Sequence, residues 1–313
     1  MKRVLAGVAT AVVAALTMTA CGGSSDPLSN NPPAQGGATS GPVAKPDKII
    51  IGSANFPESA LLAEIYAGAL QKKGITIEKK LNIGNRETYY PGLSDGSIDL
   101  VPEYTGVLLQ HINKSATETS PDEVYEALKK ALPANLTVLD KSSAEDKDAI
   151  VVTKETADRL NLKSIEDLKP HASQMIFGGP PELPRRADGF PGFKKNYDIE
   201  FKEFKALDAG GPLTVNALKT NVVQAADIFT TDPAITVNNF VVLEDPKSNF
   251  AAQNVVPLIN ASKASDEVKQ VLNQISAKLT TEKLIELNGK LSAPDKPDAA
   301  KVAADWLASA GIS

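Results

Sequence analysis

The chain has 313 residues and a formal charge of −5, from 38 acidic and 33 basic side chains. At roughly 150 residues per domain this length predicts about two domains. The lack of a dense run of Lys and Arg argues against nucleic acid as a partner. The sequence has two histidines, His111 and His171, and one cysteine, Cys21. These counts exclude internal disulfides and Cys-rich zinc sites, and they leave few residues for histidine-based catalysis, so we expect no metal and no cofactor.

Residues 1–20 have the parts of a cleavable signal peptide. Lys2 and Arg3 form a positive start, an uncharged stretch follows, and small residues precede Cys21. The uncharged stretch is too short for an ordinary membrane span. We interpret Cys21 as the lipidated N-terminus of a mature bacterial lipoprotein, held at the outer face of the cytoplasmic membrane by more than one acyl chain. The alternative is an incidental thiol at a conventional cleavage site.

Residues 21–48 are predicted to be a flexible tether that begins at the lipidated cysteine. Gly, Ser, Pro and Asn fill more than half of the positions from 22 to 48. Such a stretch cannot bury enough apolar surface to offset the entropy lost on ordering it. The folded part is therefore expected to begin near Ile49.

Beyond Ile49, strand and helix patterns alternate. The spacing of apolar residues, together with Pro and Gly at element ends, defines these elements. In chain order we expect a strand at 48–52, a helix at 57–74, strands at 75–81 and 97–101, a helix at 121–132, strands at 149–153, 240–243 and 255–259, and helices at 265–279, 281–291 and 298–310. This alternation is typical of an α/β protein with mostly parallel sheets.

The loop at 52–58 is the first candidate for a binding site. In open α/β sheets, ligands bind beyond the carboxyl ends of strands, often at helix N-termini. Gly52 permits close approach of the backbone, and Ser53 or Asn55 can cap the following helix. A plain turn between strand and helix is the alternative.

Several segments resemble the substrate-binding proteins of ABC importers for glycine betaine, choline and related osmoprotectants. They are Ile50-Ile-Gly-Ser-Ala-Asn-Phe-Pro-Glu58, Ala63-Glu-Ile-Tyr66, Leu81-Asn-Ile-Gly-Asn-Arg-Glu87, Gly96-Ser-Ile-Asp-Leu-Val-Pro-Glu-Tyr-Thr-Gly106, Pro184-Arg-Arg-Ala-Asp-Gly189, Ile228-Phe-Thr-Thr-Asp232 and Leu243-Glu-Asp-Pro-Lys247. The resemblance runs in one order from about Ile49 to the C-terminus.

The resemblance implies an α/β, two-lobed periplasmic-binding-protein (type II) fold, with two chain crossings that form the hinge and the ligand between the lobes. We expect the crossings near 149–152 and 254–258. Lobe I would then be discontinuous, with residues 49–149 and 254–313, and lobe II would comprise residues 150–253. Opening and closing of such lobes captures the ligand and presents it to a permease.

In this family an aromatic cage holds the ligand's quaternary ammonium. Such a group cannot donate hydrogen bonds, and each ring attracts it by about 0.5 to 2 kcal/mol. By resemblance, Tyr104 matches the first cage tyrosine, with a packed core tyrosine as the alternative, and Phe229 matches the third. Asp148 and Gln253 stand where the second and fourth rings are expected. Only part of the cage is therefore predicted to be present.

The residues that hold the acid end of a betaine are also altered. Arg186 matches the family arginine, but Ala54 stands where Lys is common, Ser59 where Gln often lies, and Val107 where Thr is expected. These changes predict a ligand less acidic than glycine betaine, either choline-like or a larger polyhydroxylated or phenolic compound. Asn55 and Phe56 of the loop at 52–58 complete the set of predicted ligand-binding residues.

The sequence thus predicts a monomeric solute-binding lipoprotein. It would deliver a quaternary-amine osmoprotectant or related solute to an ABC permease and its ATPase subunit. An enzyme is the competing class, but neither histidine lies near a Gly-x-Ser-x-Gly or similar nucleophile, so we expect no catalysis. A lipid-anchored sensor that binds a solute without feeding a transporter is the second alternative.

Overall fold

The computed structural model describes residues 43–312. The predicted signal peptide at 1–20, the predicted lipidation site Cys21 and most of the predicted tether lie outside the described residues. Residues 43–47 have no helix or strand. Within 43–312, no helix is both long enough and apolar enough to cross a membrane.

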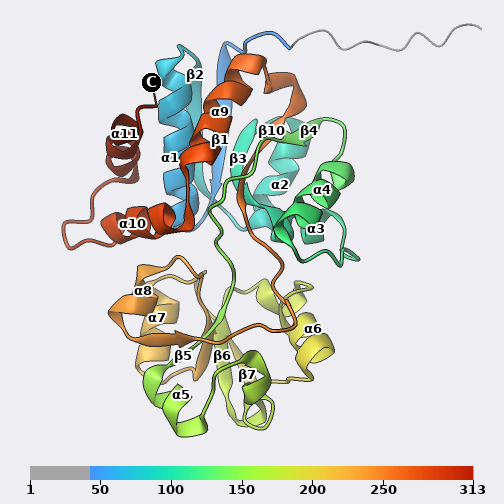
Figure 1. Ribbon diagram of the computed structural model, residues 1–313, viewed down its shortest axis with the longest axis vertical. Coiled ribbons are helices and arrows are strands. Elements are labelled where there is room, and N and C mark those ends of the chain that lie inside the picture. Colours follow the sequence, from blue (N-terminus) through green and yellow to red (C-terminus); the bar gives the residue numbers. More distant parts are fainter. Residues whose placement is uncertain (1–42, 313) are drawn as a thin grey trace, which may run out of the picture. The chain divides into compact units, whose positions relative to one another are not determined.

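Two five-stranded sheets organise the described residues (Figure 1). The first sheet has the order β2-β1-β3-β10-β4 and the second the order β7-β6-β8-β5-β9. The strands of the first sheet are β1 (Lys48–Ala54), β2 (Thr76–Gly84), β3 (Leu100–Tyr104), β4 (Leu136–Val138) and β10 (Val255–Asn260). Those of the second are β5 (Ile150–Thr153), β6 (Ile176–Gly179), β7 (Glu203–Ala206), β8 (Ala225–Asp227) and β9 (Phe240–Val242).

Helices connect the strands of both sheets. Those between or after strands of the first sheet are α1 (Pro57–Lys72), α2 (Arg86–Asp95), α3 (Thr105–Ile112), α4 (Pro121–Ala131), α9 (Asp266–Lys278), α10 (Thr281–Leu291) and α11 (Ala299–Ser309). Those between strands of the second are α5 (Lys154–Leu160), α6 (Phe190–Gly192), α7 (Pro212–Lys219) and α8 (Pro233–Val237). The five longer helices predicted from the sequence are confirmed to within two residues at each end.

Each sheet combines parallel and antiparallel strands. In the first, β1 is parallel to β2 and β3, whereas β10 is antiparallel to β3 and β4. In the second, β6 is parallel to β7 and β8, whereas β5 is antiparallel to β8 and β9. In each sheet four of the five strands therefore run in the same direction, as predicted, and only one, β10 or β5, runs the opposite way. The chain reaches both β5 and β10 from the other sheet. Each of these two strands therefore begins at the edge of its sheet where the neighbouring strands end, and it runs antiparallel to them.

The chain crosses between the sheets twice, at residues 139–149 and 243–254, and these two crossing segments pair with each other. Glu145 and Asn254 form an antiparallel bridge. The N–H of Asp146 donates to the carbonyl of Gln253 at 3.1 Å, and that of Val255 donates to Ala144 at 3.0 Å. Figure 1 shows the two segments running side by side between the sheets. The carboxyl ends of β1 and β3 point toward these crossings, because β10 enters next to the end of β3.

Helix α1 begins directly after β1 and positions the loop at 52–58. Pro57 occupies the first turn, where its missing N–H is not needed. The helix is buried on nearly all sides, with Leu61, Leu62 and Ile65 completely inaccessible. It is followed by Gly74 at a φ of 74°, a conformation that glycine adopts without strain.

The strand predicted at 97–101 is displaced in the structure, where β3 spans Leu100–Tyr104. The chain bends at Ser97 instead, where the N–H of Ser97 donates to the side chain of Asp95 and that of Ile98 to the carbonyl of Gly92. The displacement places Tyr104 at the last position of the strand, next to α3.

Candidate functional site

A pocket lies where the carboxyl ends of β1 and β3 face the loop after β8 and the two crossing segments. Its cavity volume is ≈ 50 Å³, which is smaller than most small-molecule sites. All nine residues predicted to bind ligand line this pocket: Ala54, Asn55, Phe56, Tyr104, Val107, Asp148, Arg186, Phe229 and Gln253. Ser59 lines it too. The structure brings these residues together, and their contact with a ligand stays a prediction.

Three aromatic rings follow one another along the pocket. The ring of Phe56 lies 5.0 Å from that of Phe229 and 6.1 Å from that of Tyr104, measured between centroids. Phe56 therefore joins the two rings that match the family's cage, although it comes from the loop at 52–58. The structure also places the ring of Tyr89, from α2, at the pocket. The sequence prediction did not include Tyr89.

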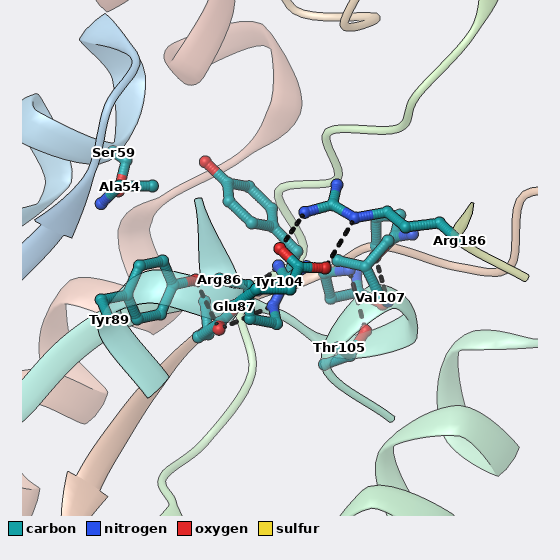
Figure 2. Close-up of polar contacts among 12 residues, drawn as sticks. Ala54, Ser59, Arg86, Glu87, Tyr89, Tyr104, Thr105, Val107 and Arg186 are labelled. Atoms are coloured by element: carbon teal, nitrogen blue, oxygen red, sulfur yellow. Dashed lines mark hydrogen bonds and ion pairs between the residues drawn. The ribbon is translucent and has the colours of Figure 1, made fainter. Parts of the chain in front are cut away.

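Arg186 is already paired within the chain. Its Nε and Nη2 donate to the two carboxylate oxygens of Glu87 at 3.3 and 3.1 Å, as Figure 2 shows, and Nη2 lies 3.4 Å from Glu182. Burial acts to raise the pKa of Glu87, but the hydrogen bond and charge of Arg186 lower it overall. A ligand carboxylate would therefore compete with two acidic side chains for this guanidinium.

A buried ion pair supports the floor of the pocket. Arg86 donates through Nε and Nη2 to both oxygens of Glu103 at 2.9 and 2.8 Å. The hydroxyl of Tyr89 and the N–H of Tyr104 also donate to Glu103, at 2.6 and 3.0 Å. Such bidentate pairing fixes the orientation of both groups. Glu103 thus sets the end of β3 from which the Tyr104 side chain projects.

Gln253 offers an unused donor to the pocket. Its side chain is 1% exposed, and its Oε1 accepts the N–H of Val107 at 3.0 Å. Among the described residues, its Nε2 has no hydrogen-bond partner. A buried donor without a partner is costly, so a ligand atom that accepts a hydrogen bond would be favoured here.

The backbone at this point of the pocket requires glycine. A Cβ placed on Gly106 would lie 2.6 Å from the carbonyl oxygen of Ala252 and 3.2 Å from Oε1 of Gln253. The glycine therefore lets the start of α3 approach the second crossing segment closely enough for Val107 to hold Gln253.

Carboxyl groups gather on the side of the pocket formed by the second sheet. Asp148, at the pocket, is half-buried, while Asp188 and Asp227 behind it are buried. Within the part of the chain that the structure describes, both oxygens of Asp227 lack a hydrogen-bond partner. Burial, reinforced by the charges of Asp148 and Asp188, raises the pKa of Asp227 well above its usual value. Burial raises that of Asp188 to about 6.

The buried carboxyls predict an unusual pH dependence of stability. Burial raises the pKa of Glu58, Asp146, Asp148, Asp188 and Asp227. The unfolded chain loses these protons at a pH of about 4. In the folded protein each of these groups keeps its proton to a higher pH. Stability is then highest at the low end of this window and falls as pH rises through the native pKa values, which for Asp188 is about 6. We expect a melting temperature several degrees higher at pH 5 than at pH 7.5.

Differential scanning calorimetry across this range checks the prediction. Asp188→Asn should reduce the difference, because the asparagine no longer titrates. Below pH 4 stability should fall again, since exposed groups such as Glu286, whose pKa two lysines lower to about 2, lose their ion pairs. A melting temperature that rises steadily from pH 5 to 7.5 would contradict the assignment.

The described residues contain no group of His, Cys, Asp and Glu side chains arranged to hold a metal ion. His111 lies in the last turn of α3 with its ring 4.8 Å from that of Tyr90, measured between centroids. His171 precedes a short 3₁₀ turn. Neither histidine lines the pocket.

Comparison with known proteins gives consistent matches. Residues 47–309 match the family described as the substrate binding domain of ABC-type glycine betaine transport systems. The carnitine transport binding protein OpuCC of Listeria monocytogenes is 27% identical over 260 residues, which are 79% of this chain and 83% of that protein. The glycine betaine-binding protein YehZ of Escherichia coli K12 is 27% identical over 289 residues, covering 88% and 94%.

The fold is also found among solved structures. A crystal structure described as a glycine betaine/carnitine/choline ABC transporter superposes with a TM-score of 0.67 at 24% identity, and covers 84% of this chain and 99% of that one. The likeness confirms the predicted α/β, two-lobed type II periplasmic-binding-protein fold. The matched relatives are solute-binding transport proteins rather than enzymes.

Proposed function

Because the chain belongs to the family of substrate binding domains of ABC-type glycine betaine transport systems, we propose that it captures an osmoprotectant or related small solute and delivers it to an ABC permease. The observation that carries the proposal is the pocket lined by all nine predicted residues. It lies beyond the carboxyl ends of β1 and β3, where α/β sheets bind ligands.

The row of rings suits a quaternary ammonium. Phe56, Tyr104 and Phe229 offer aromatic faces, and each is worth about 0.5 to 2 kcal/mol to a nearby cation. Asp148 lines the same pocket and adds negative charge there. The names of the relatives indicate which solutes to test first: carnitine for one and glycine betaine for the other.

The polar groups favour a ligand less acidic than glycine betaine. Arg186 is paired with Glu87 and Glu182. Ala54 and Val107 present no side-chain donor, whereas the buried Nε2 of Gln253 has no partner among the described residues. A ligand with one acceptor oxygen and a cationic or hydroxyl-rich remainder would match these polar groups. Choline-like, polyhydroxylated and phenolic compounds are of this kind.

Capture would use the two chain crossings as a hinge. We assign residues 49–149 and 254–313 to lobe I, and residues 150–253 to lobe II. The division is supported by the two sheets, whose strands separate at these positions, and by the hydrogen bonds between the crossing segments. In the structure Phe229 of lobe II already lies against Phe56 of lobe I, and Arg186 of lobe II is paired with Glu87 of lobe I, so opening of the hinge would separate these pairs to admit a solute.

The proposed site of action is the outer face of the cytoplasmic membrane. Acylation of Cys21 and the tether up to residue 48 would keep the binding protein near its permease and raise its local concentration there. The same arrangement would serve a solute sensor that feeds no transporter. Loss of solute uptake on deletion of the gene separates the two functions, since a sensor leaves uptake intact.

Replacing Asp148 by alanine tests the choice of ligand. We expect Asp148→Ala to weaken choline binding at least about tenfold, or 1.4 kcal/mol, because the variant removes the negative charge beside the cage. Titration calorimetry with glycine betaine, choline, carnitine and a phenolic panel measures the effect. Asp140→Ala, an exposed aspartate on the same connection, serves as the control. Tight binding of glycine betaine that persists in Asp148→Ala would contradict the proposed preference for a less acidic ligand.

A further inference from the structure

Glu58 is a buried carboxylate in the first turn of α1, and it accepts hydrogen bonds from three distant parts of the chain. The hydroxyl of Tyr104 donates to Oε1 at 2.6 Å. The hydroxyl of Thr231 and Nδ2 of Asn288 donate to Oε2 at 2.6 and 2.5 Å. Glu58 is 4% exposed and Thr231 is 2% exposed. One carboxylate thus joins the end of β3, the loop after β8, and α10.

Thr231 is itself held by the first crossing segment. Its N–H donates to Oδ1 of Asp146 at 3.1 Å, and the N–H of Thr230 donates to the carbonyl of Lys147 at 2.9 Å. Glu58 therefore connects the pocket ring of Tyr104 to the segment through which the chain passes between the sheets.

The helix does not need this carboxylate for its own formation. Pro57 already begins α1, and the residue before it, Phe56, makes no side-chain cap. Proximity to a helix N-terminus stabilises a negative charge only modestly at exposed sites. Burying a carboxylate costs more than this unless hydrogen bonds compensate, so the three donors account for its presence.

We propose that Glu58 is a positioning residue of the solute site, which fixes the ring of Tyr104 in the pocket and ties it to Thr231, so that the ring and the crossing between the sheets move together. The proposal rests on the proposed function in one respect, namely that Tyr104 contacts the solute. No contact between Glu58 and the solute is involved.

The charged groups around Glu58 define how it responds to pH. Asp146 on the first crossing segment and Asp232 at the start of α8 interact with it electrostatically, and Lys296 lines a second pocket together with Glu58. Burial raises the pKa of Glu58, while its bonds to Thr231, Tyr104 and Asn288 oppose the rise. A proton on Glu58 turns one acceptor into a donor, so the hydrogen bond with the hydroxyl of Tyr104 or Thr231 must reverse its direction or break.

The direct test needs no ligand. Protein labelled with 3-fluorotyrosine is studied by ¹⁹F NMR between pH 4.5 and 8, with the Tyr104 resonance assigned from Tyr104→Phe. We expect Glu58→Gln to shift this resonance and to remove the titration that accompanies protonation of Glu58. Thr231→Val keeps the carboxylate but removes one donor, and should shift the resonance as well. Glu64→Gln is the matched control, because Glu64 lies on the same helix, is 8% exposed and pairs with Lys79 instead.

A binding experiment adds a second readout. Using choline and glycine betaine as probes in titration calorimetry, we expect Glu58→Gln to raise Kd about tenfold over Glu64→Gln. In the Tyr104→Phe background this loss of affinity should shrink, because the effects of two substitutions that act through the same Tyr104 hydroxyl are not additive.

If neither probe binds the wild-type protein, the proposed function fails for these solutes, and the NMR comparison still decides the role of Glu58. An unchanged resonance and titration in both Glu58→Gln and Thr231→Val would overturn the inference, as would equal affinities of Glu58→Gln and Glu64→Gln for a probe that binds.

Discussion

Replacing Arg86 by methionine is expected to lower the free energy of unfolding by about 3 to 5 kcal/mol, the cost of leaving one member of a buried ion pair without its partner. Glu103 is completely buried, and Arg86 is 7% exposed. Methionine fills similar space but donates nothing, so Glu103 would keep only the hydroxyl of Tyr89 and the N–H of Tyr104. Urea unfolding followed by circular dichroism measures the loss.

Two comparisons define the origin of this effect. Arg185→Met removes an exposed arginine, and should change stability by less than about 0.5 kcal/mol, as is usual at the surface. Arg86→Met combined with Glu103→Gln should recover part of the loss in stability, because the neutral glutamine leaves no buried charge without a partner. Equal stabilities for the Arg86 and Arg185 variants would show that the ion pair does not support the site.

Replacing Phe229 by leucine is expected to weaken binding of choline about tenfold, or 1.4 kcal/mol. Leucine keeps an apolar side chain of comparable bulk but has no aromatic face, so the change removes the cation–π attraction. It also removes the contact with the Phe56 ring, 5.0 Å away between centroids. Titration calorimetry gives the affinities.

A neutral analogue isolates the contribution of the charge. 3,3-Dimethylbutan-1-ol has the shape of choline but carries no positive charge, so its weaker binding should change little in Phe229→Leu. Phe204→Leu, in the second sheet and outside the pocket, should leave choline binding unchanged. If both ligands lose affinity equally in Phe229→Leu, the ring acts through packing rather than through its π face.

Local sequence signals were sufficient for the long helices. Pro57 and Pro121 begin α1 and α4, and the pattern at 281–291 gives α10 its observed ends. Helix α2 was not predicted because Pro91 lies inside it, where proline normally removes a hydrogen bond. The strand β8 was missed since its three residues, Ala-Ala-Asp, carry no strand pattern. Its place depends on pairing with β5 and β6.

Residues of the pocket could be predicted only where the family resemblance matched them to a residue of the family's binding site. Tyr104, Phe229 and Arg186 were identified in this way, and all three line the pocket. The partners of these residues were not predicted, because they are distant in the sequence. Glu87 lies 99 residues from Arg186, and Thr231 lies 173 residues from Glu58. No local pattern encodes such contacts, which depend on how the two sheets meet.

The most direct test of the account is titration calorimetry of the wild-type protein, Tyr104→Ala and Phe229→Ala with glycine betaine, choline, carnitine and a phenolic panel. The account predicts that at least one of these solutes binds the wild-type protein, that both substitutions weaken its binding at least about tenfold, and that Phe204→Ala leaves it unchanged. Binding that is equally strong in all four proteins would place the solute elsewhere, and the absence of binding by every solute would contradict the proposed function.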